Sequence, residues 1–332
     1  MPQNKVRWGI ISTAKIGRLK VIPGIQKSDI CEVTAISSRS QKQADEAAQK
    51  LGIPKAYGSY EALLADPDID AIYNPLPNHL HVDWSIKAIE AGKHVLCEKP
   101  LGMDTADAQR LLSKSQEHPN LKVMEAFMYR FHPQWVKAKE LVLNGAIGEV
   151  KTVQSFFSYF NADPNNIRNQ ADIGGGGLMD IGCYCISFPR FIFEEEPNRT
   201  VGLLDFDPLL KTDRIASGML DFSGGKSATF TCSTQMMPFQ RALIVGTEGS
   251  IEIEIPCNAP PDKPCRLWFT TKQEKKEITF ESNDQYTSQA QVFAESILND
   301  APVPTPLEDA ISNMKAIDAI FESGKKGNWV GL

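Results

Sequence analysis

The sequence lacks the features that mark several large classes of protein. No apolar run approaches the roughly 20 residues of a membrane-spanning helix, and the chain runs from Met1 straight into a strand-like segment without the regions of a signal peptide. The seven Cys residues include no C-x-x-C pair, so the sequence indicates neither a zinc site nor a disulfide framework. Acidic residues outnumber basic ones by 41 to 35, and a net charge of −6 disfavours nucleic acid or a membrane as the main partner. These absences predict a cytoplasmic globular protein with reduced thiols.

What the sequence does contain is enough apolar residues, 42% of 332, for about two packed domains. In residues 1–125 short apolar runs alternate with helical patterns. The expected strands are Val6–Ile11, Cys31–Ile36, Asp70–Tyr73, His94–Cys97 and Leu121–Met124, and the expected helices cover about 15–26, 41–51, 79–91 and 105–116. Near-continuous apolar strands in such an alternation are typical of a parallel sheet covered on both faces. The pattern predicts an α/β fold with a doubly wound Rossmann domain over residues 1–125.

The pattern changes in residues 126–332. One helix is expected near 133–144. After it come runs of alternating apolar and polar residues, joined by Gly-rich turns, for example 152–156, 216–222, 227–232 and 249–255. A helix pair near 287–298 and 307–324 ends the chain. Alternation with period 2 predicts an α+β domain built on a mainly antiparallel sheet with one open face.

The turn after the first strand is where a dinucleotide fingerprint, G-x-G-x-x-G, is expected. The aligned residues are Ser12, Ala14 and Gly17. Small side chains still let backbone N–H groups approach a pyrophosphate at a helix N-terminus, although an ordinary strand–helix turn has the same appearance. The cofactor-binding candidates in this turn are Ser12, Thr13, Ala14, Ile16 and Gly17.

The end of the second strand indicates which nucleotide binds. NAD enzymes usually place Asp or Glu there for the ribose 2′-hydroxyl, whereas this chain has Ser37-Ser38-Arg39. A guanidinium pairs with a 2′-phosphate and a serine hydroxyl donates to it. Ser38 and Arg39 therefore favour NADP(H) over NAD(H), and the alternative is a solvated loop arginine.

Two further segments follow strands and lie at the same sheet edge, where doubly wound folds bind ligands. One is 74–81 and the other is 98–102; their candidate cofactor-binding residues are Pro75, Leu76, Asn78, His81, Glu98 and Lys99. A metal pair at His79-x-His81 is disfavoured, because no acidic or cysteine partner lies nearby at ligand spacing. Lys99, held between a strand and a proline, has an ammonium that can polarise a substrate oxygen or lower the pKa of a neighbouring hydroxyl. It could equally be a lysine on a surface turn.

In the second domain, Gly174–Gly177 lead into a helix that carries Asp180 and Tyr184. Residues four apart share one helix face. A carboxylate and a phenol on one face can position a substrate hydroxyl and carry a proton. A glycine-capped helix with a packed Tyr is the structural alternative.

Together these motifs resemble the glucose–fructose oxidoreductase / inositol dehydrogenase (Gfo/Idh/MocA) family. The resemblance rests on Glu98-Lys99-Pro100, the incomplete fingerprint and Gly-Gly-x-x-x-Asp-x-Gly-x-Tyr, and it covers essentially the whole chain. Residues 125–133 and Tyr184 are similar to the branch that holds NADP-dependent D-xylose 1-dehydrogenases and dimeric dihydrodiol dehydrogenases. The resemblance implies that Lys99 and Tyr184 face the nicotinamide with Asp180 nearby. It also implies that the open sheet face forms a dimer interface. Alternating apolar positions such as Phe156, Met219, Phe222 and Phe230 are expected on that face. An exposed apolar face of this kind predicts a homodimer or dimer of dimers.

The expected function is therefore an NADP(H)-dependent oxidoreductase acting on a CH–OH group of an aldose, polyol or related sugar. In that interpretation Tyr184 carries the proton, Lys99 stabilises the oxyanion and favours tyrosinate, and Asp180 orients the substrate. Arg130 and Arg168 are candidate substrate contacts, and no metal is expected. Two alternatives stay open: a trans-dihydrodiol dehydrogenase, and a regulator that binds NADP(H) and sugar without turnover.

Overall fold

The computed structural model describes residues 5–332, which form two compact units. The first consists of the described residues up to Met128 together with Asp284–Ile311, and the second of Tyr129–Asn283 with Ser312–Leu332. The predicted division at residue 125 is thus incomplete, because the chain returns to the first unit. Helix α8 (Gln285–Leu298) causes the return: its Phe293 ring packs against Trp8 of β1 at 5.7 Å between centroids, and both residues are fully buried.

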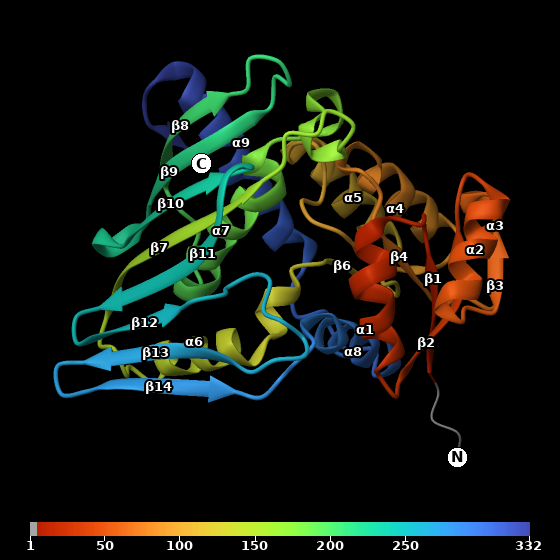
Figure 1. The fold of residues 1–332 in the computed structure, drawn as a ribbon, viewed down its shortest axis with the longest axis horizontal. Helices are drawn as coiled ribbons and strands as arrows, with labels where there is room; N and C mark the ends of the chain where they lie inside the picture. The colour runs from red at the N-terminus through yellow and green to blue at the C-terminus, as the bar shows by residue number, and fades with distance from the viewer. Residues whose placement is uncertain (1–4) are drawn as a thin grey trace. The chain divides into compact units, whose positions relative to one another are not determined.

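The first unit holds a six-stranded sheet in the order β3-β2-β1-β4-β5-β6 (Figure 1). Every neighbouring pair of strands is parallel. The strands are β1 Val6–Ile10, β2 Cys31–Ser37, β3 Lys55–Tyr57, β4 Ala71–Asn74, β5 His94–Cys97 and β6 Val123–Glu125. Because the strand order reverses between β1 and β4, ligand binding is expected at their carboxyl ends. The predicted doubly wound fold is confirmed.

Helices connect these strands. They are η1 Gly17–Val21 (a π-helix) continuing into α1 Ile22–Gln26, then α2 Gln41–Leu51, α3 Tyr60–Leu64, η2 Asn78–Leu80, α4 His81–Glu90 and α5 Thr105–Glu117. Ser40 caps α2 by accepting a hydrogen bond from Gln43 N. Gly92 follows α4 with φ +76°, the left-handed conformation that favours glycine after a helix. No helix in residues 5–332 is long and apolar enough to cross a membrane.

The second unit contains a nine-stranded sheet in the order β14-β13-β12-β11-β7-β10-β9-β8-β15. Its pairs are antiparallel except β7 with β10. The strands are β7 Val150–Phe160, β8 Arg199–Phe206, β9 Asp213–Asp221, β10 Ser227–Ser233, β11 Gln235–Gly246, β12 Gly249–Ile253, β13 Cys265–Thr271, β14 Lys275–Phe280 and β15 Val330–Gly331. The longer helices of this part of the chain are α6 Pro133–Leu143, α7 Cys183–Phe193 and α9 Leu307–Lys326, and short helical turns cover 128–131, 167–169, 171–173, 178–182 and 223–225.

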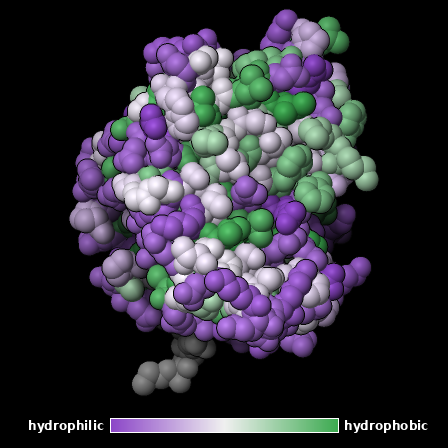
Figure 2. Space-filling view, turned by 90° about the vertical axis from the view of Figure 1, so that its left-hand side faces the viewer, coloured by the Kyte–Doolittle hydropathy of each residue, from purple (hydrophilic) through white to green (hydrophobic). Residues whose placement is uncertain are grey.

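The two faces of this sheet differ. Phe230 is 4% exposed and Phe222 is 2% exposed, so both belong to the core, and the expectation that they lie on the open face is wrong. Phe156 instead contributes to a hollow of about 270 Å³ on strands β7, β10 and β11, whose other lining residues include Gln154, Thr229, Thr231, Phe239 and Leu243. Hydrophobic side chains gather on part of the surface drawn in Figure 2, among polar ones.

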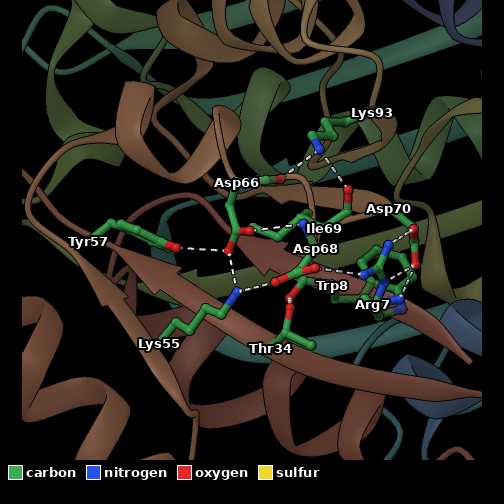
Figure 3. A network of polar contacts seen from close by, with 10 residues as sticks. All are labelled: Arg7, Trp8, Thr34, Lys55, Tyr57, Asp66, Asp68, Ile69, Asp70 and Lys93. Atoms are coloured by element: carbon green, nitrogen blue, oxygen red, sulfur yellow. Dashed lines mark hydrogen bonds and ion pairs between the residues drawn. The ribbon is translucent and has the colours of Figure 1, made fainter.

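A polar network closes the loop before β4 in the first unit (Figure 3). The Asp66 carboxylate accepts hydrogen bonds from Lys55 Nζ at 2.9 Å and from Tyr57 OH at 2.8 Å. Its backbone carbonyl accepts another from the buried Lys93 Nζ at 2.8 Å. Burial by itself raises the pKa of Asp66, but the donors around it outweigh burial and lower the pKa to about 2.

Asp66→Ala should lower the free energy of unfolding by about 1–3 kcal/mol, because it leaves the partly exposed donors Lys55 Nζ and Tyr57 OH without their buried acceptor. Asp68→Ala is the matched control: this exposed carboxylate pairs with the same Lys55, and its loss should cost under about 1 kcal/mol. Since folding lowers the pKa of Asp66 from its ordinary 3.8, its contribution is present above pH 4 and is lost as pH falls towards 2. Urea titrations from pH 2 to 7 measure both effects, and equal losses in the two variants would contradict them.

Candidate active site

The turn after β1 has a geometry that fits a nucleotide phosphate. Ser12 takes a left-handed conformation, φ +68°, and its Oγ accepts a hydrogen bond from Ala14 N at 3.3 Å. The helix that follows packs closely on β4: a Cβ built on Gly17 would lie 3.6 Å from the Tyr73 ring. Thr13, Ala14 and Ile16 are partly exposed. Small side chains around an opening helix leave its first N–H groups accessible to an anion.

At the end of β2, Ser38 and Arg39 have different surroundings. Ser38 is only 5% exposed, and its hydroxyl lies 3.3 Å from Gln43 Oε1 and 3.4 Å from Ser40 N. Arg39 is exposed. Burial raises the pKa of Tyr60, and the positive charge of nearby Arg39 opposes that rise. Of the two, Arg39 is the side chain open to a phosphate.

The segment after β4 is fixed to the segment after β5 by buried polar side chains. Asn74 Nδ2 donates to His81 O at 3.0 Å, and Asn74 Oδ1 accepts from Leu76 N at 3.3 Å. The His81 ring lies between two backbone oxygens, Leu76 O at 2.6 Å and Pro100 O at 2.8 Å. Burial lowers the pKa of His81 to about 4, against the two carbonyl contacts, which raise it.

The His81 ring is closed off from solvent, and its expected contact with the cofactor stays a prediction. It is 1% exposed and both ring nitrogens contact backbone carbonyls. Pro75 and Leu76 are likewise buried, while Asn78 is partly exposed. The ring joins the two loops, and we interpret it as a structural clamp.

Lys99 follows β5 directly. Glu98 beside it is anchored twice: its N–H donates to Asn74 O at 3.0 Å, and its Oε1 accepts from Tyr73 OH at 2.6 Å. Tyr73 is fully buried, and burial together with the Glu98 charge raises the pKa of its phenol, which keeps it a donor. Lys99 is half-buried and precedes a cis bond to Pro100. Its backbone thus lies between anchored residues.

In the second unit, the run Gly174–Gly177 forms hydrogen bonds with the backbone of the preceding loop. Gly175 N donates to Gln170 O at 2.9 Å and Gly176 N donates to Arg168 O at 2.8 Å. A Cβ on Gly175 would lie 2.6 Å from Gln170 O, so a side chain there has no room. The run folds tightly against the loop that carries Arg168.

That loop brings Arg168 to Asp180. Asp180 Oδ2 accepts from Arg168 Nε at 3.0 Å and from Tyr159 OH at 2.6 Å. Burial and the Asp180 charge raise the pKa of Tyr159 far above its usual value, so this phenol remains a donor. Tyr159 was missed by the sequence reasoning, because on β7 it looks like any aromatic residue in an alternating strand. Two donors on one oxygen hold Asp180 as an oriented carboxylate.

Tyr184 lies on the same helix as Asp180, four residues further on. A π turn, Leu178–Gly182, opens the helix and continues into α7. The Tyr184 ring is 4% exposed and packs against Tyr129 and Phe157, with centroids 6.0 and 6.1 Å away. Aromatic neighbours on two sides fix the direction of the phenol.

Arg130 lies in the interior of the second unit and does not form an open wall. It is 8% exposed, its Nη2 donates to Ser187 Oγ at 2.8 Å, and its Nε to Tyr129 OH at 3.3 Å. Tyr129 is fully buried and also bonds Ser187. These bonds hold the Arg130 guanidinium in a buried cluster, and its expected contact with substrate stays a prediction.

The structure thus groups the sequence-predicted residues in two sets. The first unit carries Ser12, Thr13, Ala14, Ile16, Gly17, Ser38, Arg39, Pro75, Leu76, Asn78, His81, Glu98 and Lys99, and the second carries Arg130, Arg168, Asp180 and Tyr184. Within the second, Arg168 and Asp180 are in contact.

Two family models match the chain. The model of an oxidoreductase family with an NAD-binding Rossmann fold matches residues 6–127, and the model of the GFO/IDH/MocA C-terminal domain matches residues 135–252.

Individual relatives extend this finding. A D-xylose 1-dehydrogenase (NADP(+)) from Haloferax volcanii is 39% identical, over 98% of this chain and 99% of the relative. A trans-1,2-dihydrobenzene-1,2-diol dehydrogenase from Xenopus tropicalis is 36% identical over 74% of each chain. Among solved structures, a 3-ketoreductase from Actinomadura kijaniata in complex with NADP and TDP-benzene superposes with a TM-score of 0.89, at 28% identity, over 96% of this chain and 98% of that one.

Proposed function

Since this chain belongs to the Gfo/Idh/MocA oxidoreductase family that its motifs predicted, we propose that it is an NADP(H)-dependent dehydrogenase of the D-xylose 1-dehydrogenase type. Its substrate class is an aldose, polyol or related sugar with a reactive CH–OH group. The observation that carries the proposal is the Asp180 carboxylate, which two donors hold on the helix that bears Tyr184. Oriented polar groups of this kind suit a hydroxyl-rich substrate, and the 39% identical relative is named as an enzyme of that type.

NADP supplies the hydride chemistry when bound. The turn at Ser12, Ala14 and Gly17 would hold its pyrophosphate, and Arg39 its 2′-phosphate. The loops joined through His81 would flank the rest of the nucleotide, with Lys99 at their end. The left-handed conformation of Ser12 and the small side chains of the turn support the fit of a pyrophosphate at this position.

Each proposed catalytic residue has one task. In oxidation, Tyr184 accepts the proton of the substrate hydroxyl, and in reduction it returns a proton to the new hydroxyl. The Lys99 ammonium stabilises the negative charge that develops on the same oxygen. Asp180 accepts a hydrogen bond from the substrate and fixes its orientation, while Arg168 and Tyr159 keep the carboxylate in place.

Oxidation of aromatic trans-dihydrodiols is the second candidate. The aromatic rings around Tyr184 and the 36% identical relative favour it. A panel of aldoses, polyols and dihydrodiols, assayed with NADP⁺ and NAD⁺, tests both candidates. Absence of turnover with every substrate, despite nucleotide binding, would favour the non-catalytic regulator instead.

We place the protein in the cytoplasm and propose a homodimer or dimer of dimers through the hollow on β7, β10 and β11. All seven cysteines are free and buried, in keeping with a reducing compartment. On the sheet, Met219 is 40% exposed and Phe239 is 52% exposed. Grouped exposed apolar side chains of this size favour association.

Replacing Arg39 tests the choice of cofactor. Arg39→Ala should lower kcat/KM with NADP⁺ roughly 10- to 150-fold, the value of a lost phosphate contact, and leave the value with NAD⁺ nearly unchanged. Lys42→Ala is the matched control, because this exposed cation is the second residue of α2 and pairs with Glu46. An unchanged NADP/NAD ratio in Arg39→Ala would show that this residue does not contact the 2′-phosphate.

Replacing Tyr184 tests the proton carrier. Tyr184→Phe keeps the packed ring but removes the hydroxyl, so kcat should fall roughly 10²- to 10⁴-fold while the Kd of NADPH stays within about twofold. Lys99→Ala should lose a comparable factor. The double variant should lose far less than the product of the two, because residues that act together are not additive. A Tyr184→Phe enzyme that keeps more than about a tenth of kcat would exclude this role.

Light scattering tests the assembly. The wild-type protein should give a mass of two or four chains of 36.7 kDa. Phe156→Arg places a charge in the hollow and should shift the mass to one chain, whereas Leu143→Arg, at an exposed position ending α6, should not. A wild-type mass of one chain at micromolar concentration would rule out the dimer.

A further inference from the structure

A buried carboxylate outside the proposed catalytic set lies against the start of the Asp180 helix. Asp213 is the first residue of β9 and is 1% exposed. Its Oδ2 accepts a hydrogen bond from Leu178 N, the first residue of the π turn, at 2.6 Å. Burial raises the pKa of Asp213 to about 7, against the N–H groups of Leu178 and Gly177, which lower it. Burying a carboxyl group costs folding free energy unless its oxygens are hydrogen-bonded. The contacts of Asp213 therefore indicate what the residue does at this position.

The second Asp213 oxygen, Oδ1, leaves room only for glycine at residue 176. A Cβ built on Gly176 would lie 2.0 Å from Asp213 Oδ1, and the residue has φ +125°, which only glycine adopts readily. The carboxylate therefore occupies the space that a side chain at residue 176 would need. Asp213 and Gly176 are matched to one another.

Gly176 in turn joins the two residues that form the Asp180 ion pair. Its N–H donates to Arg168 O at 2.8 Å, and its carbonyl accepts from Asp180 N at 3.0 Å. The same two residues meet through their side chains, Arg168 Nε to Asp180 Oδ2 at 3.0 Å. The Gly176 backbone is thus hydrogen-bonded to both residues of the ion pair, and Asp213 packs against Gly176.

We propose that Asp213 is a positioning residue for the dehydrogenase reaction, acting through Gly176 and Leu178 to hold Asp180 and Arg168 in their working geometry. The proposal rests on the proposed function in assigning Asp180 to orient the substrate. A carboxylate suits the place better than an amide, because both of its oxygens accept and the neighbouring groups are N–H donors at a helix start. Substrate handling should depend on Asp213, whereas nucleotide binding by the first unit should not.

Asp213→Ala and Asp213→Asn test this, with Asp221→Asn as the matched control. Asp221 ends the same strand, is half-exposed and pairs with Arg199. Asp213→Ala should lower kcat/KM for the best substrate by roughly 10- to 100-fold, since small misplacements of a substrate-orienting group cost that much. Asp213→Asn keeps one acceptor for Leu178 and should lose less. The Kd of NADPH should stay within about twofold in all three variants.

Hydrogen exchange provides a readout that does not need turnover. Peptides covering 176–184 should exchange faster in Asp213→Ala than in wild type or Asp221→Asn, because Leu178 N loses its acceptor. If the alanine variant does not fold, Asp213→Asn and Gly176→Ala carry the test, and Gly176→Ala should reproduce the loss in kcat/KM.

The outcomes separate the two claims. A folded Asp213→Ala enzyme with kcat/KM and exchange within twofold of wild type would overturn the positioning role. A fall in kcat/KM matched by an equal rise in the Kd of NADPH would also overturn it, because the defect would then be general. If the wild-type protein oxidises no sugar or diol, the proposed function fails, and exchange in 176–184 alone decides whether Asp213 holds this segment.

Discussion

The candidate site depends on one constraint: backbone groups buried at the ends of the parallel strands must find partners. The His81 ring contacts the carbonyls of Leu76 and Pro100, and Asn74 bonds the backbone on both sides of its own loop. Each such group left without a partner would cost about 1–3 kcal/mol. The loops after β4 and β5 are consequently fixed to one another, and Lys99 lies next to that connection.

The second unit follows the same logic with different residues. There the glycines after residue 173 bond the Arg168 loop through their N–H groups, and the joint they form presents Asp180 to Tyr159 and Arg168. Two of the helical segments beside candidate-site residues contain a π turn near their start, Gly17–Val21 and Leu178–Gly182. Such turns are rare and concentrate at functional sites. In each unit a non-standard helix start is held by neighbouring polar groups.

Much of this could be predicted from the sequence, and the failures have physical causes. The β–α alternation of the first unit was predicted because its strands are nearly continuous apolar runs. Strands β11 and β14 were missed, since much of each is exposed and their patterns carry little hydrophobic signal. Alternation also assigned Phe230 to one face of the sheet without showing which face the helices cover. The sequence also does not predict that α8 belongs to the first unit, because the apolar face of a helix does not specify the sheet on which it packs.

The type of a polar residue predicted where it lies in the fold better than it predicted what its side chain does. His81 was selected at the predicted ligand edge of the first domain, and Arg130 and Arg168 were selected as substrate contacts in the second. Arg168 bonds the Asp180 carboxylate, whereas the ring of His81 and the guanidinium of Arg130 lie in the interior. The two groups whose role was missed, Tyr159 and Asp213, are also largely buried.

Burial explains both errors. It displaces the pKa of His81 to about 4 and that of Asp213 to about 7, and both side chains contact the backbone around the site. A perturbed pKa is usually taken to mark a reacting group. In this protein His81 and Asp213 show a second cause: burial displaces the pKa of a side chain that positions the backbone, because it disfavours the charged form.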